Sequence, residues 1–225
     1  MQPKEPEIIY PDSDGQPMAD STTQYRWITK IKGGCDAIFK ENENVFIAGD
    51  LLWYPVEGKP QICQSPDTMV VFGRPKGDRS SYRQWREDNM PPQVVFEIRS
   101  HNDSDTKMAK KFSFYQRYGV EEYYLYDPES NNLQGWQRIE GLLEVIEPMN
   151  NWVSPRLGIK FAWQEEGLEI YAPNGESLVD YVDLYAQKEL EKQEKELAQQ
   201  RAEQERQRAE KLLAQLRAAG IEPEE

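Results

Sequence analysis

Three residues have the types and the spacing needed for metal-assisted hydrolysis: Asp67, Glu97 and Lys111. Asp67 follows Pro66 at the start of one predicted strand, and Glu97 lies near the end of the next. If these two strands pair antiparallel, both carboxylates fall at the same end of a sheet. Two hard oxygen ligands and a backbone carbonyl suit Mg²⁺ or Mn²⁺, which can make hydroxide from bound water and stabilise charge on a phosphoryl oxygen. The pattern therefore predicts a divalent-metal site.

The third residue, Lys111, lies on a predicted helix. Residues 105–118 predict one, because Met108, Phe112 and Tyr115 share a face and Gly119 is placed to end it. Relative to Met108, Lys111 lies about 60° around the helical wheel, beside the apolar face, whereas Lys110 points nearly opposite. Lys111 is therefore expected to reach the sheet, with Lys107 as the reserve candidate.

The other elements are predicted from apolar segments and turn residues. Strands are expected at 44–54, 67–72, 93–99 and 122–127, a hairpin at 133–139 and 142–146, and a first helix at 23–31. The Val-Val-Phe run within 93–99 is typical of a central strand buried on both faces. Strand, helix and strand in that order predict a parallel crossover.

Four stretches, together with an acidic and basic tail, resemble the Uma-two family of restriction endonucleases, in the PD-(D/E)xK nuclease superfamily. They are AGDLLWYP at 48–55, SPDTMVV at 65–71, VFEIRS at 95–100 and KFSFYQRYGVEEY at 111–123, with WVSPRLG at 152–158 as a further likeness. The resemblance implies an α/β fold with a restriction-endonuclease-like central mixed sheet flanked by helices, plus a long C-terminal helix. It also implies an endonuclease that uses Mg²⁺ or Mn²⁺ to hydrolyse phosphodiester bonds of DNA.

The resemblance also assigns roles to positions. Asp67 matches the Asp of PD, Glu97 the acidic member of (D/E)xK, and Lys111 a lysine that has moved onto the following helix. Asp50 matches an acidic position on the preceding strand, although it reads equally well as a charge at a sheet edge. Arg99 occupies the ordinary lysine position and cannot act as a base at neutral pH.

One loop, 74–86, is locally basic and contains interleaved aromatic residues. Its Arg74, Lys76, Arg79 and Arg83 are candidates for nucleic-acid contacts along a phosphate backbone. The alternative reading is a solvated connection between the two acidic strands.

Charge and length favour two further expectations. The 225 residues, with 27 Lys and Arg against 40 Asp and Glu, fit one globular domain plus an appendage, and the acidity argues against tight DNA binding. The expected division is an N-terminal arm at 1–22, a nuclease-like domain at 23–177, a charged helix at 178–220 and a tail at 221–225. The helix is either solvated and held by charge pairs or a coiled coil that makes a homo-oligomer.

The remaining features narrow the class of protein. Two separate cysteines and a single histidine argue against a zinc site or a disulfide framework. With no long apolar run and no signal-peptide core, we expect no membrane span and a cytoplasmic location. The alternative function is a catalytically inactive nuclease fold that serves as an interaction module through its helix.

Overall fold

The computed structural model describes residues 8–15, 17–164 and 167–219. The chain divides into two compact units, and the boundary in the sequence falls between Asp180 and Tyr181. In the described part of the predicted arm 1–22, residues 8–15 and 17–21 contain neither helix nor strand, and Thr22 already begins the first helix. The predicted tail 221–225 lies outside the described residues. Every site residue predicted from the sequence belongs to the first unit.

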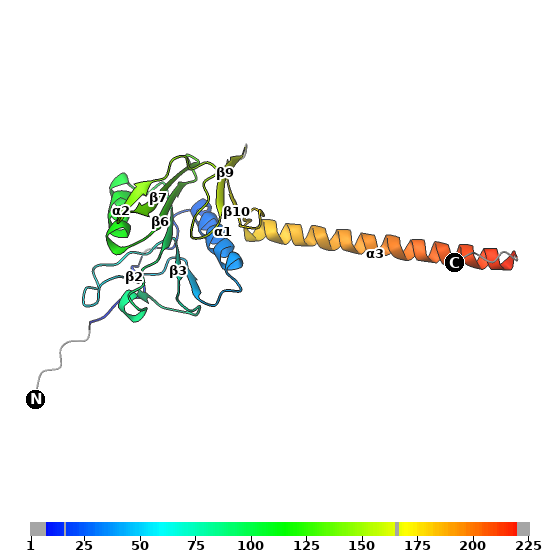
Figure 1. Ribbon diagram of the computed structural model, residues 1–225, viewed down its shortest axis with the longest axis horizontal. Helices are drawn as coiled ribbons and strands as arrows, with labels where there is room; N and C mark the ends of the chain where they lie inside the picture. Colours follow the sequence, from blue (N-terminus) through cyan, green and yellow to red (C-terminus); the bar gives the residue numbers. More distant parts are fainter. Residues whose placement is uncertain (1–7, 16, 165–166, 220–225) are drawn as a thin grey trace, which may run out of the picture. The chain divides into compact units, whose positions relative to one another are not determined.

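A six-stranded sheet with the order β1-β3-β5-β6-β7-β8 forms the centre of the first unit (Figure 1). The strands are β1 (Val45–Ala48), β3 (Thr68–Phe72), β5 (Val94–Ile98), β6 (Glu122–Asp127), β7 (Asn132–Ile139) and β8 (Leu142–Val145). Strands β5 and β6 pair parallel, and every other neighbouring pair is antiparallel. The predicted central mixed sheet and its parallel crossover are therefore confirmed.

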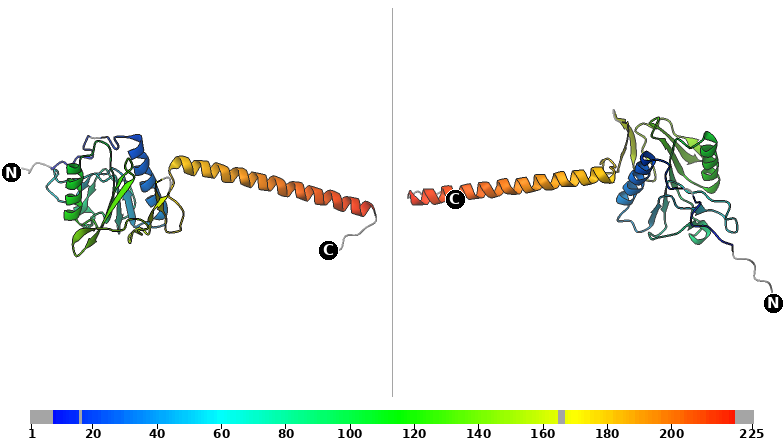
Figure 2. Two further views of the ribbon diagram at one scale, coloured as in Figure 1. Left: turned by 90° about the horizontal axis from the view of Figure 1, so that it is seen from above. Right: turned by 180° about the vertical axis from the view of Figure 1, so that it is seen from behind.

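The two faces of this sheet carry different helices. Figure 2 shows α1 (Thr22–Ile38) and α2 (Asp105–Tyr118) on opposite faces. In β5, Phe96 packs in the cluster that includes residues of α1, and Val95 packs in the cluster that includes residues of α2. Successive side chains of a strand point to opposite faces, so Glu97 shares the face of Val95 and is directed towards α2.

The predicted strand at 44–54 is wrong as a single strand. It divides into β1 and a short β2 (Trp53–Tyr54), which pairs parallel with β4 (Tyr82–Arg83) in a separate sheet. The break falls at Asp50, whose φ of 48° lies in the left-handed region that a strand cannot contain. A short 3₁₀ helix, η1 (Gln84–Arg86), follows β4.

Helix α1 is longer than the predicted 23–31 and runs through two glycines to Ile38. Glycines disfavour helices, but a Cβ at Gly34 would lie 1.5 Å from Cδ2 of Leu178. Glycine is therefore required there by packing. The C-terminal helix begins at Tyr181 and not at the predicted residue 178, because Leu178 packs in the core of the first unit.

The sequence analysis missed the hairpin of β9 (Lys160–Gln164) and β10 (Gly167–Tyr171). Phe161, Leu168 and Ile170 of this hairpin pack in the same core cluster as α1. The hairpin therefore helps to complete the α1 face of the unit.

In the second unit the structure describes residues 181–219, which form one helix, α3 (Tyr181–Ala218), of 38 residues. None of its residues is buried, and Leu190, Leu197 and Leu212 are exposed apolar side chains. No helix among the described residues is both long and apolar enough to cross a membrane.

Candidate active site

The two predicted acidic residues lie beside each other on antiparallel strands. Strand β3 pairs with β5 in a register that places Thr68 opposite Phe96, so Asp67 and Glu97 are the next residues along. Oδ2 of Asp67 accepts a hydrogen bond of 2.6 Å from the backbone N–H of Ile98. The antiparallel pairing that the site required is therefore present.

Glu97 is held by two side chains of α2. Lys111 Nζ donates to Glu97 Oε2 at 2.5 Å, and the hydroxyl of Tyr115 donates to Oε1. Only 1% of Glu97 is exposed. Since an uncompensated buried carboxylate costs several kcal/mol, Lys111 is what makes this position tolerable for a charged group.

Helix α2 places both donors through ordinary sequence features. The side chain of Ser104 caps its first turn, and Gly119, with φ of 93°, ends it in the left-handed conformation. Met108 and Tyr115 are buried against the sheet, so the predicted packing face is confirmed, and Lys111 lies between them on the same face. Residues three or four apart on a helix are neighbours, which brings Lys111 and Tyr115 to one carboxylate.

Burial and charge shift the titration of the group. Burial, reinforced by the Glu97 carboxylate, raises the pKa of Asp67 well above its usual value. Burial would lower the pKa of Lys111, but the Glu97 and Asp67 carboxylates outweigh it and raise that pKa. This direction favours the protonated, positively charged form of Lys111.

A cavity of about 390 Å³ lies beside these residues and is lined by Asp67, Lys111 and Asp50. Asp50 Oδ1 accepts a hydrogen bond of 2.7 Å from the hydroxyl of Ser65, and burial raises the pKa of Asp50. The structure therefore brings Asp50, Asp67 and Lys111 to one cavity, and Glu97 lies immediately behind its wall.

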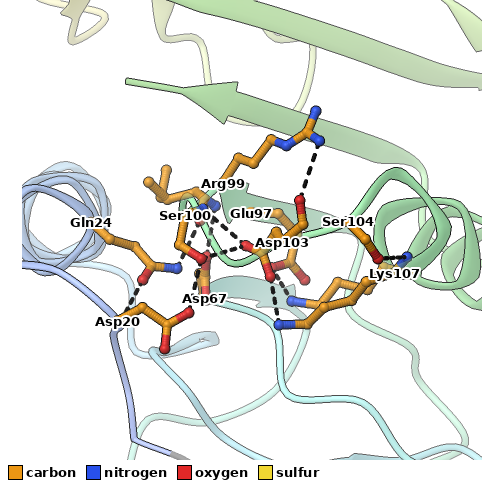
Figure 3. Close-up of polar contacts among 11 residues, drawn as sticks. Asp20, Gln24, Asp67, Glu97, Arg99, Ser100, Asp103, Ser104 and Lys107 are labelled. Atoms are coloured by element: carbon orange, nitrogen blue, oxygen red, sulfur yellow. Dashed lines mark hydrogen bonds and ion pairs between the residues drawn. The ribbon is translucent and has the colours of Figure 1, made fainter. Parts of the chain in front are cut away.

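Sequence reasoning missed a polar network on the other side of Asp67. Gln24 of α1 donates through Nε2 to the carbonyl of Ile98 at 2.8 Å, and its Oε1 accepts from the N–H of Asp20 at 2.7 Å. Ser100 donates to Asp20 at 2.8 Å. Figure 3 shows Gln24 approaching from the α1 side and Lys107 from the α2 side, with Asp67 and Glu97 between them. Gln24 thus fixes the backbone that carries the Asp67 contact.

Lys107, the reserve lysine, has a different partner. Its Nζ contacts Asp103 Oδ1 at 2.5 Å, and both residues line the same cavity. This contact, with the Ser100 hydrogen bonds, outweighs burial and lowers the pKa of Asp103. Arg99, at the ordinary lysine position, turns away and contacts Asp105 at 2.5 Å.

The donor set suits a hard divalent cation. Oδ1 of Asp67 accepts no hydrogen bond from the described residues, and Asp67 faces the cavity. Each oxygen of Glu97 has one donor and so retains a lone pair. The described chain contains no group of three acidic, histidine or cysteine side chains arranged for a metal. Magnesium commonly uses one or two carboxylates and keeps several waters, so the pair of Asp67 and Glu97 fits it.

The four predicted nucleic-acid contacts are engaged within the protein. Arg74 and Arg79 both pair with Glu87, and Arg79 also lies 3.8 Å above the ring of Phe46. Lys76 Nζ donates to two backbone carbonyls. Arg83 lies 4.0 Å from Asp12 and 5.1 Å from the ring of Tyr10. None of the four lines the active-site cavity.

Comparison with known proteins places the chain in a family. The model of the Uma2 family, described as "putative restriction endonuclease", matches residues 25–200. Among solved structures, the chain is similar to "a putative nuclease belonging to DUF820 from Anabaena variabilis ATCC 29413", at 15% identity and a TM-score of 0.46, covering 61% of this chain and 75% of that one. No curated protein matches it. The family match spans most of the chain and includes Asp50, Asp67, Glu97 and Lys111, and this chain therefore belongs to the Uma2 family.

Proposed function

We propose that the protein is a divalent-metal-dependent endonuclease that hydrolyses phosphodiester bonds of DNA. The observation that carries the proposal is the contact between Lys111 and Glu97 beside Asp67, at the wall of a cavity. Membership of the Uma2 family supports a nuclease. The metal, the DNA substrate and the roles of individual residues belong to the proposal.

Asp67 and Glu97 are the residues that would hold Mg²⁺ or Mn²⁺. The bound ion would act as a Lewis acid and lower the pKa of a coordinated water molecule. Asp50, on the same cavity wall, is a further acceptor for a water molecule or for the ion's hydration shell. In this proposal, Asp67 and Glu97 bind the ion directly, and Asp50 holds the water molecules around it.

Lys111 supplies positive charge and hydrogen bonds. It lines the cavity as a protonated ammonium, so it can donate to a phosphoryl oxygen or orient a water molecule while it neutralises the acids. Tyr115 acts as a positioning residue, because its hydroxyl fixes the second oxygen of Glu97. The pKa of Tyr115 is raised well above its usual value by burial and by Glu97, which keeps it a donor.

The proposal includes DNA contacts by loop 74–86, whose cations differ in how readily they could exchange their present partners for a phosphate. Arg74 and Arg79 would have to exchange a carboxylate of Glu87 for a phosphate. Lys76 is exposed and bound only to carbonyl oxygens, so it is the most available of the four. Phosphate is a stronger acceptor for an ammonium than a neutral carbonyl, which favours the exchange at Lys76.

A cleavage assay tests the proposal. Supercoiled plasmid is incubated with the protein and Mg²⁺ or Mn²⁺, beside Glu97→Gln, Asp67→Ala and a chelator control. We expect nicking that needs the ion and is abolished in both variants, with metal binding lost in Asp67→Ala. Unchanged nicking by both variants would show that the nicking activity does not depend on Asp67 and Glu97. A wild-type protein that neither nicks DNA nor binds metal would favour the alternative function.

The alternative is an inactive nuclease fold that acts as an interaction module. It is favoured by the exposed leucines of α3, because Leu190 and Leu197 are seven residues apart, the spacing of a coiled-coil seam. The same helix would make a homo-oligomer of an active enzyme. Assembly and catalysis are therefore tested separately.

Removal of the residues after Leu184 tests the assembly. If α3 forms a coiled coil, light scattering of the full chain gives the mass of a dimer or larger particle, and the truncated chain gives that of a monomer. The far-ultraviolet and near-ultraviolet circular dichroism of the first unit should persist. A monomeric mass for both chains would identify α3 as a solvated helix.

A further inference from the structure

A second cavity, of about 540 Å³, lies along the exposed face of α2. It is lined by Lys110, Ser113, Phe114 and Arg117 of the helix and by Ile62 of the loop that precedes Asp67. The helical wheel places Lys110 nearly opposite Met108 and about 100° from Lys111. The groove therefore uses the face of α2 that is directed away from the buried apolar side chains.

The groove is locally positive in an acidic protein. Its described lining contains two cations and no acidic residue, whereas the whole chain has a net charge of −13. Lys110 and Arg117 are exposed and form no ion pair with the described residues. In loop 74–86, by contrast, Arg74 and Arg79 are already paired with Glu87. Lys110 and Arg117 can therefore bind an anion without displacing a carboxylate.

The groove and the active-site cavity are lined by the same two elements, one loop and helix α2. Gln61, Ile62 and Cys63 line the groove, and Gln64 and Ser65, the next residues in the same loop, line the active-site cavity. Helix α2 likewise contributes to both. A polymer that occupied the groove would therefore extend naturally towards Asp67 and Lys111.

The spacing of the two cations fits a repeating anion. Lys110 and Arg117 are two helical turns apart, about 10.5 Å along the axis. One strand of duplex DNA carries a phosphate about every 3.4 Å of helix axis, so two cations at this separation can contact different phosphates of one strand. The partly exposed rings of Phe114 and Tyr118 lie between and beside the cations and offer apolar surface to sugars or bases.

We infer that this groove binds the sugar–phosphate backbone of the DNA strand that enters the active site, with Lys110 and Arg117 on its phosphates. The inference rests on the proposed function and adds the path of the substrate to it. It also explains how a strongly acidic chain can bind DNA. DNA would contact Lys110 and Arg117, which form a local positive surface on a chain whose net charge is negative.

Binding measurements with the full chain in a metal-free buffer test this path. The probes are one fluorescein-labelled DNA duplex and its labelled single strand, measured by anisotropy over a range of salt concentrations. We expect Lys110→Gln/Arg117→Gln to raise Kd about tenfold and to reduce the slope of log K against log salt by about 1.4–1.8, the value for two lost phosphate contacts. Each single variant should produce about half of the change in slope.

Arg26→Gln is the matched control for each single variant. Arg26 is an exposed cation of α1 with no ion pair among the described residues, and it lines neither cavity. Its replacement should leave the affinity within about twofold. Equal affinities and salt slopes for this control and the double variant would overturn the groove.

The cleavage assay separates failure of the groove from failure of the proposed function. Metal-dependent nicking that is lost in Glu97→Gln but unchanged in Lys110→Gln/Arg117→Gln overturns the groove alone. A wild-type chain that neither binds nor cuts DNA overturns both. Reduced nicking that is restored by higher concentrations of Lys110→Gln/Arg117→Gln supports the groove, because a binding defect is overcome by mass action and a chemical defect is not.

Discussion

Two carboxylates on neighbouring strands of the sheet, Glu97 of β5 and Glu122 of β6, are each only 1% exposed. Glu97 is paired with the ammonium of Lys111 and lies beside a second acid, Asp67. Glu122 instead accepts from the hydroxyls of Tyr124 and Ser154 and from the N–H of Arg156. The two carboxylates are equally buried, but an ion pair offsets the desolvation cost of Glu97 and neutral hydrogen-bond donors offset that of Glu122.

The difference teaches how to separate a structural carboxylate from a chemical one. The donors of Glu122 belong to its own strand and to the 154–156 segment, so it fastens that segment to the sheet and faces neither cavity described above. The Glu97 cluster combines two acids, a buried cation and an adjoining cavity. Burying these charges costs free energy of folding, and such clusters are typical of functional sites. Burial alone is therefore a poor guide to function, and the kind of partner is a better one.

The largest expected effect comes from removal of the buried cation. Lys111→Met leaves Glu97 and Asp67 without their counter-charge, so we expect a loss of about 3–5 kcal/mol in the free energy of unfolding. Cleavage should be abolished at temperatures where the variant is still folded. Urea denaturation and plasmid nicking measure the two effects, and a variant as stable as the wild type would contradict the charge balance described here.

Glu122→Gln is expected to have the next largest effect on stability. The glutamine amide retains one oxygen acceptor, but its NH₂ group faces groups that donate hydrogen bonds to the glutamate. At least one of the three hydrogen bonds is therefore lost, which lowers the free energy of unfolding by about 1–3 kcal/mol. Nicking per folded molecule should be unchanged. A loss of nicking in the folded variant would erase the distinction between the two glutamates.

Glu97→Gln should produce the opposite combination. It removes the ion pair with Lys111 but also the repulsion of Asp67, and Lys111 keeps Asp67 as a counter-charge, so the free energy of unfolding should change by less than about 1 kcal/mol. Nicking should disappear. Melting temperature and nicking rate are measured on the same preparation, and strong destabilisation would show that Glu97 is mainly a structural partner of Lys111.

The smallest expected effect is a pH dependence confined to Glu122. Burial raises the pKa of Glu122 above its ordinary value of 4.5, despite the donors that oppose it. The folded state then holds this proton more tightly than the unfolded state. The contribution is fully present below pH 4.5 and is lost as the pH rises through the folded pKa.

Comparison with Glu122→Gln isolates this contribution. The difference in the free energy of unfolding, wild type minus Glu122→Gln, should fall as the pH is raised from 4.5 towards 7. Urea denaturation at intervals of pH measures it. A difference that rises over the same interval would mean that the hydrogen bonds, and not burial, dominate at this carboxylate.

The sequence was most informative where the contacts are local or the pattern is repeated. The bounds of α2 and β6 were predicted to the residue, and their C-terminal ends are marked by Gly119 and Pro128. The position of Lys111 followed from the helical wheel, which depends only on 3.6 residues per turn. The placement of Asp67 and Glu97 at one sheet end followed from antiparallel pairing.

Contacts between distant segments could not be predicted in this way. The hydrogen bond from Gln24 to Ile98 joins residues 74 positions apart, and that from Ser100 to Asp20 joins residues 80 apart. No pattern within either segment specifies its partner. The extension of α1 through Gly34 was missed for the same reason, since the side chain that requires glycine there comes from Leu178.

The sequence by itself determined the inventory of charged groups and the local elements that carry them, because helix and strand periodicity depend on neighbours in the chain. Only the tertiary structure decided which charges are paired. It placed Glu87 against Arg74 and Arg79, which loop 74–86 alone had suggested as free cations, and left Lys110 and Arg117 without a partner among the described residues. Ion pairs act over a few ångströms of space, whatever the separation along the chain, so their assignment requires the fold.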